Sequence, residues 1–384
     1  MNLESTKRHN KAFAAPDLSS EGALQLVGLS FDEMKEVVLS IGEPAFRAKQ
    51  LYQWIYQKGV SDWSLMMNLP EKMRGLLSEK YSIARPEVTS HQKSTDGTQK
   101  WLLKMADGQE IETVFIPESR RGTLCVSSQV GCTLSCKFCH TGTQGLVRNL
   151  GAREIVLQVM QTLDGLDGWP IGSGKAKELT NIVFMGMGEP LYNYDEVVKA
   201  VKILTDENGL NFSRRKITIS TSGVVPMIEQ LGKDVNTGLA ISLHAVTDEV
   251  RDYLVPLNKK YNIDTLLQAC KNYPNVSQMR PITFEYVMLK DVNDSDGDAK
   301  KLVSLMKRLP SKVNLIPFNP WPGAAFECSS KNRIKAFASI LEKAGFESPV
   351  RRARGQDILA ACGQLKSEST RAKLKELQGK EVSA

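Results

Sequence analysis

Several features that would place a protein in a special class are missing from this sequence of 384 residues. No uninterrupted apolar run approaches the ~18–20 residues that span a bilayer, so we expect no membrane segment. The stretch from Met1 to Pro16 is polar and basic, without the apolar core of a secretory signal, which favours a cytoplasmic protein. No internal repeat or low-complexity tract stands out. Apolar residues make up 41% of the chain and charged residues 24%, which excludes a mostly disordered protein.

Histidine is scarce, with four residues, and the sequence contains no HxxxH and no second CxxC motif. Structural zinc sites favour such separated pairs, so their absence argues against one. The seven cysteines are an odd number in a chain without a secretory signal, and a disulfide framework is therefore not expected. The formal net charge of +7 and the basic character of the last 34 residues favour an acidic partner such as nucleic acid.

The hydrophobic pattern divides the chain into parts of different character. Helical periodicity at Phe31 and Met34, from Phe46 to Ile55 and near Met73 predicts a small helical N-terminal domain. Two β-rich runs flank an Ala-Asp-Gly turn at 106–108 and predict a β-hairpin. We therefore expect five parts: a flexible arm (1–22), a helical domain (23–86), a β-hairpin extension (87–120), an α/β domain (121–345) and a C-terminal extension (346–384).

Strands and helices are expected to alternate through the α/β domain. This alternation predicts a parallel sheet with right-handed crossovers. Six units are too few for a complete eight-stranded barrel, which leaves a partial (βα)6 TIM-type barrel or a doubly wound sheet. In either fold a ligand binds at the carboxyl ends of the strands. The expected strands are 124–130, 181–185, 216–220, 238–243, 282–289 and 313–316, and the expected helices are 154–163, 194–204, 263–270, 298–309 and 332–344.

The strongest chemical signal is a C-x3-C-x2-C motif formed by Cys132, Cys136 and Cys139. It begins two residues after the end of the first expected barrel strand. Thiolates suit zinc or an iron–sulfur cluster. A [4Fe–4S] cluster with three cysteine ligands keeps one iron open for a substrate. The alternative is a structural zinc site with His140 or Cys125 as the fourth ligand.

Small and polar residues follow several of the later strands. Residues 185–190 read MGMGEP, and the glycines permit close approach to the backbone while Glu189 can accept hydrogen bonds from an ammonium group. Further strand ends carry STSG at 220–223, SLH at 242–244 and FNP at 318–320. Each places polar groups at the expected ligand face, although such residues are also common as turns and helix caps.

The C-x3-C-x-aromatic-C loop resembles the radical S-adenosylmethionine (SAM) superfamily. In that superfamily the open iron chelates the amino and carboxylate groups of SAM, and an electron then cleaves the sulfonium to give a 5′-deoxyadenosyl radical. The segments around Cys125 and Cys362 narrow the resemblance to dual-specificity RNA methyltransferases of the RlmN type. The matching segments are 121–132, 185–191, 220–226, 242–245, the stretch from Val255, 314–323 and 354–365.

The resemblance implies methylation of C2 of one adenosine in 23S rRNA and of an adenosine in certain tRNAs. Adenine C2 lies between two ring nitrogens and is too electron-poor to attack a methyl group, so the reaction needs a radical route. In this family Cys362 would take a methyl group from one SAM. A radical from a second SAM would remove hydrogen from that methyl, and the carbon radical would add to C2. Cys125 would then resolve the RNA–protein adduct and form a transient disulfide with Cys362.

The resemblance also implies the cluster ligands, a proton acceptor, the SAM contacts and an electron donor. It implies Cys132, Cys136 and Cys139 as ligands of the [4Fe–4S] cluster and Glu112 as proton acceptor. An electron donor such as flavodoxin with its reductase is expected, and the default assembly is a monomer. Cys270 and Cys328 match no motif. The segment 354–363 is expected to be mobile because Cys362 must serve two SAM reactions. The implied SAM contacts are Gly188, Glu189, Ser220, Ser242, Leu243, His244 and Asn319.

Two alternative functions stay open at this point. A Cfr-type enzyme methylates adenine C8 with the same cysteine chemistry, and motif spacing does not separate C2 from C8. A zinc-stabilised RNA-binding protein without catalysis is compatible with the basic tail and the helical N-terminal domain.

Overall fold

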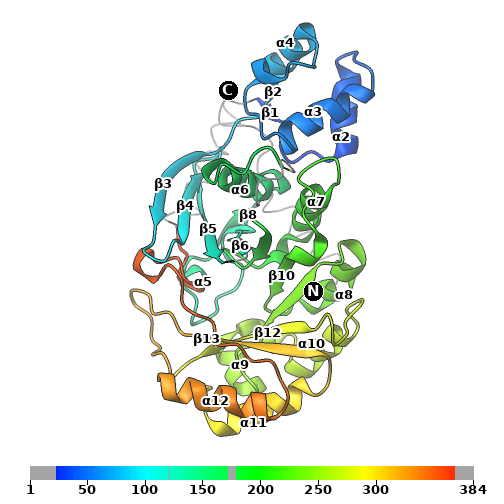
Figure 1. The fold of residues 1–384 in the computed structure, drawn as a ribbon. Coiled ribbons are helices and arrows are strands. Elements are labelled where there is room, and N and C mark those ends of the chain that lie inside the picture. Colours follow the sequence, from blue (N-terminus) through cyan, green and yellow to red (C-terminus); the bar gives the residue numbers. More distant parts are fainter. Residues whose placement is uncertain (1–22, 120, 172–178, 368–384) are drawn as a thin grey trace, which may run out of the picture.

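The computed structural model describes residues 23–119, 121–171 and 179–367 (Figure 1). Its centre is a nine-stranded sheet in the order β13-β12-β11-β10-β9-β6-β5-β4-β3. The first six strands in this order pair in parallel, which confirms the predicted α/β partial barrel. These strands are β6 (Arg121–Cys125), β9 (Asn181–Phe184), β10 (Ile217–Thr221), β11 (Gly238–Ser242), β12 (Ile282–Met288) and β13 (Ser311–Pro317).

Amphipathic helices connect the parallel strands and bury their apolar sides. Polar caps start several of them: Ser295 and Asp298 form a reciprocal capping pair, and Asn262 and Ser330 accept hydrogen bonds from the first turns of their helices. The five predicted helices are present, and α8 was not predicted. The helices are α6 (Ala152–Gly165), α7 (Tyr194–Thr205), α8 (Val225–Asp234), α10 (Ile263–Lys271), α11 (Asp296–Met306) and α12 (Lys331–Lys343), with the shorter α5 (His140–Gln144) and α9 (Asp248–Leu254).

The predicted β-hairpin is part of the barrel sheet. β4 (Gln99–Lys104) and β5 (Glu110–Glu118) form the hairpin, and β3 (Glu87–Lys93) adds a third antiparallel strand. β5 also pairs antiparallel with β6, from Val114 opposite Cys125 to Glu118 opposite Arg121. Five consecutive residues of β5 are buried, as expected for an interior strand that is covered on both faces.

The first barrel strand is shorter than predicted. Residues 124–130 were expected to form one strand, but β6 ends at Cys125, and β7 (Gln129–Gly131) pairs antiparallel with β8 (Leu146–Asn149) in a separate sheet. The strand is interrupted at Ser127 and Ser128, two buried polar residues between β6 and β7 that bond to other parts of the protein. The Ser127 hydroxyl donates to the Glu112 carbonyl at 2.6 Å, and the Ser128 amide donates to the Met187 carbonyl at 2.8 Å. The cysteine motif therefore begins seven residues after the barrel strand, not two.

Three helices form the N-terminal region, as predicted: α2 (Phe31–Ser40), α3 (Phe46–Tyr56) and α4 (Glu71–Lys80). The short strands β1 (Leu24–Gln25) and β2 (Tyr81–Ser82) pair in parallel and close the region. Gly28, at φ 95°, lies against Arg153 so closely that a Cβ there would come within 2.4 Å of the arginine backbone. This contact joins the helical region to α6 of the barrel.

The chain returns over the barrel after α12. The amides of Val313 and Leu315 donate to the carbonyls of Glu347 and Pro349, so residues 347–351 run along β13. The segment then reaches the loop between β3 and β4, where the Gly355 amide donates to Asp96, and continues to α5, where the His140 amide donates to the Gly363 carbonyl (Figure 1). None of the helices that the structure describes is long and apolar enough to cross a membrane. The expected flexible arm and the end of the basic tail lie outside the described residues.

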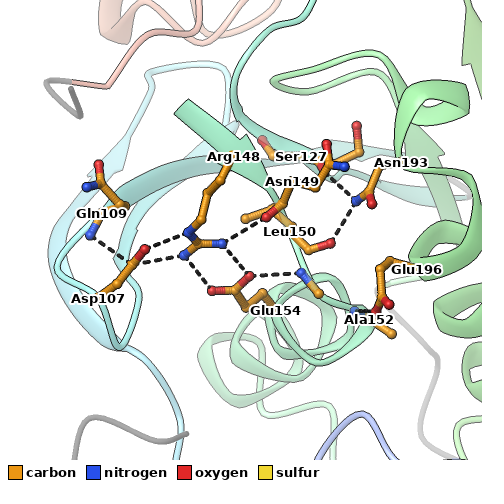
Figure 2. Close-up of polar contacts among 12 residues, drawn as sticks. Asp107, Gln109, Ser127, Arg148, Asn149, Leu150, Ala152, Glu154, Asn193 and Glu196 are labelled. Carbon is orange, nitrogen blue, oxygen red and sulfur yellow. Dashed lines mark hydrogen bonds and ion pairs between the residues drawn. The ribbon is translucent and has the colours of Figure 1, made fainter. Parts of the chain in front are cut away.

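A buried ionic network joins the hairpin to the barrel (Figure 2). Arg148 on β8 has no exposed surface, and its guanidinium binds both oxygens of Asp107 in the hairpin turn, at 2.5 and 2.9 Å. The same guanidinium binds both oxygens of Glu154 on α6 at 2.8 Å. Two carboxylates thus compensate the buried cation, which raises the pKa of Arg148. Loss of the arginine would leave both carboxylates buried without a counter-ion.

We expect Arg148→Met to lower the free energy of unfolding by about 3–5 kcal/mol, because it removes the partner of two buried charges. Urea denaturation measures this change. Lys233→Met is the control, because the Lys233–Glu229 pair is about half exposed, at 57% and 48%, and such pairs contribute only about 0.3–0.5 kcal/mol. Equal losses in the two variants would contradict the assignment of Arg148 as a structural centre.

Candidate active site

The cysteine motif forms a compact loop between β7 and α5. Gly131, at φ 72°, precedes it, and a Cβ there would lie 1.9 Å from the Gly145 carbonyl, so only glycine fits. The Cys132 amide donates to that carbonyl at 3.1 Å, and the Cys139 amide donates to the Cys136 carbonyl at 3.1 Å. These bonds close the loop on itself and fix the backbone of all three cysteines.

The three thiols of this loop influence one another electrostatically. Burial raises the pKa of Cys132 well above its usual value, and the neighbouring Cys136 and Cys139 raise it further. Burial, followed by Cys139, raises the pKa of Cys136 to about 12. Three thiolates in this space therefore require a cationic group to compensate them.

The spacing of possible ligands bears on which group fits. Among residues 23–119, 121–171 and 179–367, no three Cys, His, Asp or Glu side chains are placed to hold one metal ion. A [4Fe–4S] cluster carries its irons on separate corners, so its thiolates lie farther apart than the ligands of one ion. His140, a candidate zinc ligand, stacks on Trp321 at 4.7 Å between ring centroids. Three cysteine thiols on one short loop are a donor set that fits an iron–sulfur cluster.

The glycine-rich turn after β9 packs on the segment that leads into the cysteine loop. A Cβ on Gly186 would lie 2.7 Å from the Val126 carbonyl, and one on Gly188 would lie 2.6 Å from Cβ of Gln129. These glycines were expected to give a ligand access to the backbone. The structure gives a different reason for them, because the close neighbour is another part of the protein.

Glu189 connects the ends of two adjacent barrel strands. The residue is 2% exposed, and its carboxylate accepts hydrogen bonds from the amides of Leu191 at 3.1 Å and Ser222 at 2.7 Å. Burial raises the pKa of Glu189, and these hydrogen bonds partly offset the shift. The side chains of Thr221 and Ser222 also stabilise the charged form of this carboxylate.

The polar ends of β10 and β11 are held by an arginine that the sequence did not single out. Arg251 on α9 has no exposed surface and donates to the carbonyls of Ser222 at 2.7 Å, Ser242 at 3.1 Å and Leu243 at 3.0 Å. Burial lowers its pKa to about 10. Ser220, on β10, is 8% exposed. Nothing in the local sequence around Arg251 marks a buried arginine.

His244 adopts the left-handed conformation, at φ 59°, directly after Leu243. Its Nδ1 accepts a hydrogen bond from the Val287 amide at 3.1 Å, and its ring meets Phe138 of the cysteine loop at 4.5 Å between centroids. Burial, with a smaller effect of Arg251, lowers the pKa of His244 to about 3. The imidazole is therefore neutral near pH 7.

The C-terminal segment places Cys362 over the cysteine loop. The His140 amide donates to the Gly363 carbonyl at 2.8 Å, and the Thr141 hydroxyl donates to the Leu365 carbonyl at 2.6 Å. The Asn319 amide group donates to the Cys362 carbonyl at 3.2 Å. Its oxygen accepts from Gln356 at 3.0 Å, so Asn319, an expected SAM contact, binds the C-terminal segment on both sides here.

Cys125 and Cys362 lie within electrostatic range of each other, and both are free thiols. Burial raises the pKa of Cys125 to about 12. Cys362 keeps exposed surface, yet the surrounding protein still raises the pKa of its thiol to about 11. Arg351 lowers the pKa of both thiols, and Cys139 of the loop raises that of Cys362. The structure thus brings Cys362 close to Cys125 and to the cysteine loop, although Cys362 lies far from both in the sequence.

Glu112 does not face solvent. It is 5% exposed on β5, forms an ion pair with Lys100 at 2.7 Å, and accepts a hydrogen bond from the Lys366 amide at 2.8 Å. Burial raises its pKa, and Lys100 opposes the shift. The carboxylate therefore lies directly beside the segment that carries Cys362. Cys270 is buried in the core and Cys328 is exposed, both outside this cluster.

The sequence is similar to proteins of known family over most of its length. The profile of the Radical SAM superfamily matches residues 126–303, and that of the ribosomal RNA large subunit methyltransferase N-terminal domain matches residues 24–83. A dual-specificity RNA methyltransferase RlmN of Rhodospirillum rubrum is 56% identical over 348 residues, covering 91% of this chain and 81% of the relative. The RlmN of Acidiphilium cryptum is 55% identical over 360 residues, covering 93% and 92%.

The chain belongs to the RlmN family.

A solved structure agrees with this assignment. The crystal structure of a radical SAM methyltransferase from Sphaerobacter thermophilus superimposes with a TM-score of 0.84 at 43% identity, covering 90% of this chain and 99% of the other. As a member of the RlmN family the chain is a radical SAM RNA methyltransferase, and its cofactors are a [4Fe–4S] cluster and SAM. The alternative of a non-catalytic zinc protein is therefore wrong.

The neutral state of His244 predicts a pH dependence of stability. In the unfolded chain His244 binds a proton below a pKa of about 6.5, whereas in the native state it stays neutral down to a pKa of about 3. The free energy of unfolding therefore falls as the pH falls from 6.5 toward 3. We expect a loss of up to about 1.4 kcal/mol per pH unit in this window relative to His244→Asn, which keeps an acceptor for Val287. Urea denaturation from pH 7 to pH 4 measures the difference, and parallel curves for the two proteins would contradict it.

Proposed function

We propose that this enzyme methylates C2 of one adenosine in 23S rRNA and of an adenosine in certain tRNAs. The relatives at 55–56% identity carry the name of dual-specificity RNA methyltransferases. The observation that carries the proposal is the placement of Cys362, which lies over the loop of Cys132, Cys136 and Cys139 and within electrostatic range of Cys125. A methyltransferase that transfers the methyl group of SAM directly to a nucleophile needs neither a cysteine carrier nor a cysteine loop of this kind.

The cysteine loop and the strand ends would share the two cofactors. Cys132, Cys136 and Cys139 would hold the cluster, because their thiols lie within electrostatic range of one another and would need a cationic group there. When bound, the cluster and SAM supply an adenosyl radical. SAM would contact the ends of neighbouring parallel strands, as expected for this architecture. The proposed contacts are Gly188, Glu189, Ser220, Ser242, Leu243, His244 and Asn319.

Cys362 would carry the methyl group. A thiolate is the nucleophilic form of cysteine, and Arg351 is the cation that favours ionisation of Cys362. The exposed surface of Cys362 gives SAM and RNA access to its sulfur. Because the segment 354–363 also occupies Asn319, we propose that it shifts off Asn319 when SAM binds. The Cys362 thiolate would then take the methyl group from the sulfonium of this SAM, with S-adenosylhomocysteine as the leaving group, and the segment would return with the methylated cysteine.

Cys125 would release the product. Its thiolate would attack the sulfur of Cys362 and form a disulfide while the bond between that sulfur and the transferred carbon breaks. The carbon would keep the electron pair of that bond and take up a proton to become the methyl group. Arg351 also favours the thiolate of Cys125. Glu112 would accept the proton that C2 loses, since it lies beside the Cys362 segment through its bond to the Lys366 amide. The raised pKa of this carboxyl suits a proton acceptor.

Methylation of adenine C8, as in Cfr-type enzymes, would use the same cysteines. The segments 220–226 and 354–365 resemble the C2 enzymes and favour the first proposal. We further propose that the helical domain (23–86), the β extension (87–120), the barrel (121–345) and the C-terminal extension (346–384) are separate parts of the enzyme. RNA would bind the helical domain and the basic tail of the C-terminal extension. A flavodoxin-type protein would supply electrons, and the enzyme would act as a cytoplasmic monomer.

Anaerobically purified enzyme should be brown, contain iron and sulfide, and form 2-methyladenosine in 23S rRNA and tRNA. Mass spectrometry of the digested RNA resolves 2-methyladenosine from 8-methyladenosine. The Cys136→Ala variant is the control and should lose iron and methylation together. Detection of 8-methyladenosine alone would transfer the assignment to the C8 reaction, and colourless protein with one zinc ion would refute the cluster.

Cys125→Ala should accumulate enzyme that is covalently bound to RNA, because the adduct cannot be resolved, whereas Cys362→Ala should form no adduct and no methylated product. Denaturing gels with labelled RNA detect the adduct. Cys328→Ala is a matched control at an exposed cysteine outside the site and should keep methylation within about twofold of the wild type. Methylation by Cys362→Ala would show that the methyl carrier is misassigned.

A further inference from the structure

The side chain of Gln129 links the two halves of the cofactor site. Gln129 is on β7, has no exposed surface, and uses both ends of its amide group. Its oxygen accepts hydrogen bonds from the backbone amides of Thr133 at 3.1 Å and Glu189 at 3.0 Å. Its nitrogen donates to the Thr133 hydroxyl and to the Asn149 oxygen, each at 2.8 Å. Every hydrogen-bonding position of this amide is therefore occupied.

The two backbone amides that donate to the Gln129 oxygen belong to different parts of the proposed site. One lies in the cysteine loop, which would hold the cluster, and the other lies in the turn after β9, which would contact SAM. Thr133 directly follows the ligand Cys132, and Glu189 belongs to the glycine-rich turn. The backbone supports the same contact, since the amides of Ser128 and Gln129 donate to the Met187 carbonyl at 2.8 and 3.1 Å. One oxygen atom thus fixes the separation between the cysteine loop and the turn.

The far end of the Gln129 amide is anchored in the ionic network of Figure 2. Its partner Asn149 follows Arg148, whose guanidinium also donates to the Asn149 carbonyl at 3.0 Å. Arg148 is held in turn by Asp107 and Glu154. The amide of Gln129 cannot rotate or shift without breaking buried hydrogen bonds, so it is a rigid spacer.

We propose that Gln129 is a positioning residue that sets the distance between the cysteine loop and the Gly188–Glu189 turn, so that one SAM molecule reaches the open iron and the turn at once. The inference rests on the proposed function. A ligand held at two points loses affinity when the points shift by a fraction of an ångström, because it cannot satisfy both. The contribution of Gln129 should therefore appear in SAM affinity beyond any change in fold stability.

Gln158 offers a matched control. It is also a fully buried glutamine, on α6, and its amide bonds the amide and the carbonyl of Ser127 at 2.8 and 3.0 Å. It contacts neither the cysteine loop nor the turn through any of its hydrogen bonds. Gln129→Met and Gln158→Met remove the same chemical group from equally buried positions.

Equilibrium binding of SAM to the cluster-loaded proteins tests the proposal. Gln129→Met should raise the Kd for SAM about tenfold, the equivalent of one ordinary hydrogen bond, while Gln158→Met should change it less than about twofold. Both should lower the urea midpoint and retain iron. The change that SAM causes in the electron paramagnetic resonance spectrum of the reduced cluster should differ from wild type only in Gln129→Met.

Equal Kd values for the two variants, or SAM affinity that follows the urea midpoint, would overturn the role of Gln129. Gln129→Glu and Gln158→Glu repeat the comparison if the methionine variants do not fold. Gln129→Glu keeps the oxygen that accepts from Thr133 and Glu189, so its Kd should lie between those of wild type and Gln129→Met. Wild-type enzyme that binds no cluster or no SAM would instead refute the proposed function.

Discussion

The path of the chain into the cysteine loop depends on the buried polar contacts of Ser127, Ser128 and Gln129, which follow the first barrel strand. A buried polar group is costly unless it is paired, and these three residues find partners on β5, on α6, on β8 and in the turn after β9. Their requirement for partners ends β6 at Cys125 and directs the chain into the cysteine loop. It also explains the two glycines of the turn, which must come close to this segment.

The C-terminal segment completes the site from the opposite side. Hydrogen bonds from His140 and Thr141 at the start of α5 hold it next to the cysteine loop, and the hydrogen bond from the Lys366 amide holds it next to Glu112. Asn319 binds this segment here, so in the proposed cycle its side chain would serve two successive purposes, first holding the segment and then contacting SAM. Arg351 lies within electrostatic range of both Cys125 and Cys362, at the point where the segment leaves β13.

Local patterns predicted much of this architecture. Periodicity and turn chemistry identified the three N-terminal helices, the hairpin around residues 106–108 and the six parallel strands. The same reasoning joined residues 124–130 into one strand, because an apolar run does not reveal that Ser127 and Ser128 find buried partners elsewhere. It also gave no sign of Arg251 or Gln129, whose importance lies in contacts with residues far away in the sequence.

The sequence by itself determined the chemistry: the C-x3-C-x2-C motif and the segments around Cys125 and Cys362 identified the family, since reactive groups in fixed local order need no fold to be recognised. Only the tertiary structure decided how these groups meet. It showed that Glu112 is buried beside the Cys362 segment, that Asn319 binds that segment, and that the glycines serve backbone packing. Burial and distance arise from the packing of remote elements, and no local pattern encodes them.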